Sequence, residues 1–145
     1  MVFSANAADA PSYIIKEETL SFGKIAVVSR AVTSSLSIDI DGKITTTKGI
    51  YILEVGHPAE LIMVNYTPYT QYSISVFIAD PETTTGAISS NQFTLTSVTA
   101  PLTITTDSEG EASFSVGGTI ETSGDTSKTY YDTDYQARYM LTITY

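Results

Sequence analysis

The stretch of sequence that most strongly indicates the fold is Tyr72-Ser73-Ile74-Ser75-Val76-Phe77-Ile78. Apolar side chains stand at every second position from Tyr72 to Ile78, which is the two-residue period of a β-strand with one buried face. Similar alternation occurs in residues 32–40, 111–116 and 139–145, and no window of the chain places apolar side chains at helical spacing. Alternation with one solvated face is typical of antiparallel sheets. The sequence therefore predicts an all-β fold of antiparallel strands.

Glycine and proline mark turns between the strand-like runs, for example at Asp41-Gly42, Asp80-Pro81 and Gly117-Gly118. The runs recur about every 8–12 residues, as in sandwiches and barrels. We expect roughly nine or ten strands, some of them merged, from the runs 13–16, 18–28, 32–40, 43–47, 50–56, 60–66, 72–79, 92–97, 102–105, 111–121 and 135–145. In the third run, the predicted inward face is Val32, Leu36, Ile38 and Ile40. The predicted architecture is an immunoglobulin-like antiparallel β-sandwich.

The first residues differ in character from the rest of the chain. They contain Ala5-Asn6-Ala7 and Ala8-Asp9-Ala10, which both look like small-residue sites of signal-peptide cleavage. The apolar stretch before them is shorter than the ~7–15 residues of a complete signal. Residues 1–12 are therefore predicted to be an N-terminal extension, either the remnant of a signal or a working part of the mature chain. Residues 13–145 are predicted to form one β-sandwich domain, because this length suits a single core.

The composition excludes several kinds of chemistry. The chain has no cysteine and 1 histidine, so it offers no disulfide framework, no thiolate metal site and no cysteine nucleophile. Its formal net charge is −9 with 7 lysine and arginine residues, which argues against a basic face for nucleic acid. No apolar run approaches the ~18 residues of a membrane-spanning helix. We therefore expect no nucleic-acid partner, no transmembrane helix and no cofactor.

The titratable residues form no recognisable catalytic or metal-binding set. His57 lies in Gly56-His57-Pro58 and has neither a second histidine nor a Gly-x-Ser-x-Gly elbow to work with, so we interpret it as a turn residue. Asp39-Ile40-Asp41-Gly42 is similar to the opening of a calcium loop but lacks the closing glutamate. Residues 107–134 are rich in acids, and of weak calcium binding and solvated turns we favour the turns. We expect no catalytic residue, no metal ligand and no enzyme activity.

The tyrosines are more informative, because the chain has 10 of them and no tryptophan. A tyrosine combines a large apolar face with a polar tip and is favoured at interfaces. One group flanks Pro68 and another lies near the C-terminal end of the sequence. Contact with a partner or ligand and plain core packing are equally good interpretations. The candidates for surface contact are Tyr66, Tyr69, Tyr130 and Tyr131.

Four motifs, taken in order, resemble one protein family. They are Leu20-Ser21-Phe22-Gly23, the paired runs 60–64 and 72–76, the run 110–120 that ends in Gly-Gly-Thr-Ile, and the run 135–145 that ends on tyrosine. This order is similar to that of a bacterial surface-domain family of unassigned function, related to chaperone–usher pilins of the Mat/Ecp (common pilus) type. The resemblance covers residues 12–145.

The resemblance implies a structural subunit of a secreted surface filament or fimbria. Such pilins have an immunoglobulin-like sandwich that lacks one strand, and they reach the cell surface through the periplasm with a chaperone and an outer-membrane usher. The N-terminal extension of the next subunit then adds the missing strand by β-augmentation. Because head-to-tail addition does not close on itself, the expected partner is the chain itself, in a homopolymer.

The resemblance also implies roles for residues at both ends of this sequence. The terminal strand would line the acceptor groove with Tyr139, Leu141, Ile143 and Tyr145. The donor strand would come from the N-terminal residues, and its candidates are Val2, Phe3, Ala5 and Ala7, or Tyr13 and Ile15 in a second possible segment. The alternative hypothesis is a monomeric extracellular β-sandwich module that binds a carbohydrate or a host protein through exposed tyrosines.

Overall fold

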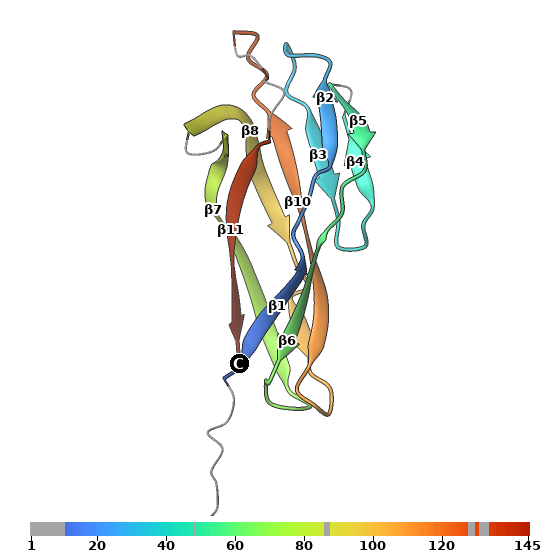
Figure 1. The fold of residues 1–145 in the computed structure, drawn as a ribbon, viewed down its shortest axis with the longest axis vertical. Coiled ribbons are helices and arrows are strands. Elements are labelled where there is room, and N and C mark those ends of the chain that lie inside the picture. Colours follow the sequence, from blue (N-terminus) through green and yellow to red (C-terminus); the bar gives the residue numbers. More distant parts are fainter. Residues whose placement is uncertain (1–10, 48, 86–87, 128–129, 131–133) are drawn as a thin grey trace, which may run out of the picture.

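The computed structural model describes residues 11–47, 49–85, 88–127, 130 and 134–145. These residues form eleven strands, and every pairing between them is antiparallel, which confirms the predicted all-β sandwich-like fold (Figure 1). The strands are β1 (Tyr13–Glu18), β2 (Lys24–Val27), β3 (Ser35–Ile38), β4 (Ile44–Thr46), β5 (Ile50–Glu54), β6 (Ala59–Val64), β7 (Gln71–Thr85), β8 (Ile88–Thr99), β9 (Thr103–Thr105), β10 (Ala112–Thr122) and β11 (Gln136–Thr144). Within these ranges no helix is long and apolar enough to cross a membrane.

Strands β1 and β2 lie along β6 and β5 as one interrupted ladder. Tyr13 is opposite Val64 at one end and Val27 is opposite Ile50 at the other, and a bridge between Ser21 and His57 joins the two parts. At this joint Gly23 has a φ of 78°, and a Cβ on Gly23 would overlap the backbone of β5. The glycine therefore lets the two backbones approach closely at the joint, where the register shifts between Lys24 and Ile25.

Strand β10 connects the two layers of the sandwich. Its first half, Ala112–Val116, pairs with β6, whereas its second half pairs with β3 on one side and β8 on the other. The sheet then continues from β8 through β7 to β11, and β9 completes the side of β7 that faces away from β11. The change of partner falls at Gly117, where any side chain would overlap the backbone of Ile38. The predicted turn at Gly117-Gly118 is therefore a close backbone approach inside a continuous strand.

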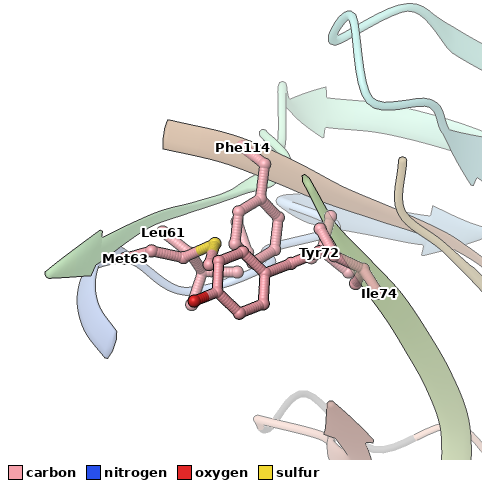
Figure 2. Close-up of a cluster of buried hydrophobic side chains, with 7 residues drawn as sticks. Leu61, Met63, Tyr72, Ile74 and Phe114 are labelled. Atoms are coloured by element: carbon pink, nitrogen blue, oxygen red, sulfur yellow. The ribbon is translucent and has the colours of Figure 1, made fainter. Parts of the chain in front are cut away.

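The inward faces of these strands form two buried clusters. We name them the lower core (Ala59, Leu61, Met63, Tyr72, Ile74, Phe114 and Val116) and the upper core (Leu36, Ile50, Phe93, Leu95 and Ile120). Figure 2 shows Phe114 of β10 packed among side chains of β6 and β7 in the lower core. Tyr72 and Ile74 are buried, as the alternation in β7 predicted.

Two further local expectations were wrong. Val32 is 61% exposed and not part of the inward face, because β3 begins only at Ser35 and the preceding residues bend. Asp80-Pro81 is not a turn, because β7 continues to Thr85. The partner strand β11 has register irregularities on both sides of Arg138, which faces Asp80. A proline, which lacks an N–H, is tolerated in a strand beside such an irregularity.

Candidate functional site

The outermost strands of the main sheet, β1 and β11, both border the lower core. Among the described residues β1 pairs only with β6, and β11 pairs only with β7. Ile14 of β1 packs against the lower core from one edge, and Leu141 and Ile143 of β11 pack against it from the other. Figure 1 shows the beginning of β1 and the end of β11 at the same end of the molecule. The lower core is thus flanked by two strands that each have an open backbone edge.

The lower core is incompletely covered where β11 borders it. The inward side chains of β11, from Tyr139 to Ile143, are only half-buried. In the adjacent strand β7, Tyr72 and Ile74 are buried, whereas Val76 and Ile78 are also only half-buried. Partial burial is still sufficient to raise the pKa of the Tyr139 phenol, because water is removed from its charged form. Apolar surface of the core therefore remains accessible to solvent at this edge.

Neither edge is protected by charge at this end of the molecule. Soluble sheet proteins usually place lysines, prolines or bulges on edge strands to prevent pairing with another chain. In β11 the only charged residue is Arg138, and the stretch Tyr139–Thr144 has no charge and no proline. In β1 the charges begin at Lys16, after the apolar Tyr13–Ile15. The unprotected parts of both edges therefore flank the same core cluster.

The structure places the predicted strand-addition residues in three different settings. Val2, Phe3, Ala5 and Ala7 lie outside the described residues. Tyr13 and Ile15 belong to β1 in the domain's own sheet and are 46% and 42% exposed, whereas Ile14 between them faces the core. Sequence reasoning overlooked Ile14, although the alternation in this stretch required that either Ile14 or its two neighbours face inward.

The four predicted groove residues also lie in different positions relative to the lower core. Tyr139, Leu141 and Ile143 are partly buried and pack against the lower core. Tyr145 is 95% exposed, and its ring centroid lies 5.9 Å from that of Tyr72. Tyr145 therefore stands at the end of the sandwich and not in its wall.

Two of the four tyrosines proposed for surface contact are half-buried and pack within the domain through part of their surface. Tyr66 forms an edge-to-face pair with Tyr72, with ring centroids 5.1 Å apart, and burial together with the Tyr72 phenol raises the pKa of Tyr66. Tyr130 packs edge-to-face on Phe93, and its hydroxyl accepts a hydrogen bond from the Ser123 N–H at 3.0 Å and donates one to a backbone carbonyl. Tyr69 is 76% exposed, and Tyr131 lies outside the described residues.

The backbone of His57 forms hydrogen bonds that join two segments of the chain. Its backbone N–H donates to the Ser21 carbonyl at 2.8 Å, and the Ser21 N–H donates to the His57 carbonyl at 3.0 Å. The imidazole Nδ1 lies 3.4 Å from a carboxylate oxygen of Glu18 on the solvated surface. His57 is therefore a bridging residue of the interrupted ladder and not a free turn residue. The described part of the chain has no group of three or more His, Cys, Asp or Glu side chains that could hold a metal ion.

The acidic motifs have a common structural explanation. In each of two turns an aspartate Oδ1 accepts hydrogen bonds from two backbone N–H groups further along the turn, at 2.8–2.9 Å for Asp39 and 2.9 Å for Asp107. Each turn then closes through a glycine with positive φ, Gly42 or Gly110. Asp39–Gly42 is similar to a calcium loop because a turn of this kind also requires a carboxylate and a glycine. Here the carboxylate accepts backbone hydrogen bonds.

These hydrogen bonds predict a pH dependence of stability. The N–H groups of Glu111 and Glu109 hold the pKa of Asp107 below its ordinary value of 3.8. A carboxylate with a lowered folded-state pKa stabilises the fold above its unfolded pKa, and this contribution is lost as the pH falls through the folded pKa. We expect Asp107→Asn to lower the urea midpoint at neutral pH, and the difference from wild type to shrink below about pH 4. Urea unfolding across this range tests it, and a difference that is independent of pH would contradict it.

Comparison with known proteins gives one match. A family model described as "Domain of unknown function (DUF4402)" matches residues 13–145, which covers most of the chain. No curated protein and no solved structure matches the chain.

Proposed function

Since the chain belongs to the DUF4402 family of domains of unknown function, we propose from its geometry that it is a structural subunit of a surface filament. In this proposal a strand from one copy is added to the open edge of the next. One observation carries the proposal: the lower core is flanked by two unprotected edge strands, β1 and β11, and the inward side chains of β11 are only half-buried.

An added strand would pair with the free backbone groups of this edge and would also cover its half-buried apolar side chains. Each hydrogen bond to the backbone of β11 has a net value of about 0.5–1.5 kcal/mol. Its inward side chains would also cover Leu141 and Ile143, and complete burial of one such side chain is worth roughly 1.5–3 kcal/mol relative to full exposure. Several of these contributions together can exceed the entropy lost when two molecules associate.

The residues that precede β1 are the proposed donor. Residues 13–18 already form β1 of their own sheet, so a donor must come from residues 1–10, where Phe3, Ala5 and Ala7 alternate with smaller or polar residues. At about 3.3 Å per residue, six extended residues span roughly 20 Å, which is enough to pair with the uncharged stretch Tyr139–Thr144 of the acceptor strand β11. Addition in this direction does not close on itself and yields a filament.

The proposal has consequences for location and partners. An open apolar edge risks aggregation before assembly. A periplasmic chaperone that occupies this edge and an outer-membrane usher that exchanges it for the donor would fit the same geometry. The subunit would then be a secreted, cell-surface protein. A charged fraction of only 16% favours close contact between copies over mutual repulsion.

Deletion of residues 1–10 tests the proposal. The shortened chain should remain folded and monomeric, because it keeps all eleven strands and loses only the donor. Sedimentation velocity should show assemblies for the complete chain and a monomer for the shortened one.

The shortened chain also provides an internal control, because it keeps its acceptor edge. When it is mixed with the complete chain, it should occupy donor segments and shorten the assemblies in proportion to the amount added. Filaments of unchanged length in the mixture, or assemblies formed by the shortened chain alone, would contradict the proposal.

A further inference from the structure

A cleft of about 590 Å³ lies at the end of the sandwich where the β6–β7 and β9–β10 connections meet. Its walls are residues 11–12 before β1, residues 65–68 after β6, and Glu109 in the β9–β10 connection. This volume is within the range of small-molecule sites. None of the residues that line the cleft belongs to β11.

The wall of the cleft contains unusual backbone geometry. Asn65 has a φ of 62° and Tyr69 a φ of 51°, and they are the only non-glycine residues with positive φ in the described part of the chain. A bulky side chain in the left-handed region costs of order 1–3 kcal/mol, and such strain is concentrated at functional sites. The strain falls on Tyr69, because asparagine adopts this conformation readily. Tyr69 directly follows residues 65–68, which form one side of the cleft.

Hydrogen bonds hold this turn against its neighbour. The Tyr66 N–H donates to the Gly110 carbonyl at 3.1 Å, and the Tyr69 N–H donates to the Asp107 carbonyl at 3.2 Å. The Thr106 hydroxyl donates to the Thr67 carbonyl at 2.6 Å. The wall is therefore fixed in place, which reduces the entropy that a ligand would have to overcome on binding.

The cleft presents polar groups that the described part of the chain does not use. The side-chain amide of Asn65, the carboxylate of Glu109 and the hydroxyl of Tyr66 have no intramolecular hydrogen-bond partner there. An amide both donates and accepts, and a carboxylate accepts from two hydroxyl groups. The half-buried Tyr66 also lines the cleft. Sugars combine adjacent hydroxyl groups with an apolar face of C–H groups. In this cleft the hydroxyl groups would bind the amide and the carboxylate, and the C–H face would pack on the aromatic ring.

The charge of the cleft selects among sugars. Its lining contains Glu109 but no lysine, arginine or histidine, and the whole chain has a formal net charge of −9. Acidic sugars would therefore be repelled. We propose that this cleft binds a neutral saccharide, with Tyr66 against its apolar face and Asn65 and Glu109 on its hydroxyl groups.

Amide-resolved NMR titration of the complete chain tests the inference. The probes are lactose, maltotriose, cellotriose and triacetylchitotriose, each raised to millimolar concentration, with sialyllactose as the acidic comparison. At least one neutral probe should shift the amide signals of residues 65–69 and 108–110, whereas sialyllactose should bind more weakly than lactose.

Two variants change the polar contacts without disturbing the backbone: one removes a side-chain amide and the other removes a charge. Asn65→Gly keeps the left-handed conformation and removes the amide, and Glu109→Gln removes the negative charge from an exposed position. Each should weaken binding about tenfold or more, as expected for the loss of a hydrogen bond that involves a polar or charged group. The control Tyr51→Ser removes an exposed tyrosine of β5, outside the cleft, and should leave binding unchanged.

Three results would overturn the inference. They are the absence of shifts with all four neutral probes, shifts that persist unchanged in both Asn65→Gly and Glu109→Gln, and tighter binding of sialyllactose than of lactose.

Discussion

Replacement of Phe114 by alanine is expected to destabilise the fold by about 3–5 kcal/mol, which is the usual cost of removing a buried phenylalanine ring. Phe114 is 5% exposed and lies in the lower core between side chains of β6 and β7 (Figure 2). The change removes buried apolar surface and leaves a cavity that the surrounding strands cannot fill. Because single domains are stable by only about 5–15 kcal/mol, the variant should lose a large part of its stability.

Phe77→Ala is the matched control, since it deletes the same ring from a different environment. Phe77 is 51% exposed on the outer face of β7, where it lies opposite the equally exposed Met140. Its replacement should change stability by about 0.5 kcal/mol or less, as for most surface sites. Urea unfolding monitored by circular dichroism measures both changes. Equal shifts of the unfolding midpoint in the two variants would show that burial of Phe114 in the lower core does not make the expected contribution to the free energy of unfolding.

Ile143→Lys is expected to abolish self-association while leaving a folded monomer. Ile143 lies on the inward side of β11 and is half-buried beside the lower core. In the monomer a lysine can extend its ammonium group past the open edge into water. A strand added to this edge would bury that charge, which is costly without a partner of opposite charge. Inward-pointing charges are also a device by which natural edge strands prevent pairing.

Thr142→Lys is the control for this prediction. It introduces the same charge one position away, on the exposed face of β11, where an added strand would leave it in solvent. Sedimentation velocity and electron microscopy should show assemblies for Thr142→Lys and monomers for Ile143→Lys, while thermal unfolding verifies that both variants fold. Assembly by both variants, or by neither while both remain folded, would contradict addition of a strand at β11.

The strands themselves could be predicted because alternation is a local property. A residue and the one two positions later point to the same face in any strand, so the pattern from Tyr72 to Ile78 identifies β7 without knowledge of its neighbours. The prediction failed where backbone conformation overrides side-chain pattern. Val32 continues the alternation of β3 but precedes the strand, and Pro81 has the character of a turn residue but lies in β7.

The candidate sites were harder to predict, since each combines residues that are distant in sequence. Tyr139, Leu141 and Ile143 were identified from alternation and resemblance, but the role of Ile14 depends on which face of β1 meets the core. The cleft combines Ser12, Asn65 and Glu109 from three segments, and only the turn preference of asparagine signals any part of it.

Sequence alone was thus sufficient for the all-β class, for most strand positions and for the absence of cysteine chemistry, because these depend on residue type and on the spacing of neighbours. It could not tell that β1 pairs with β6 in the domain's own sheet, nor that the lower core stays open beside β11. The reason is that every strand offers the same row of N–H and C=O groups, so the choice of partner is not encoded in those groups. That choice depends on packing across the whole domain, and the open edge and the cleft arise from it.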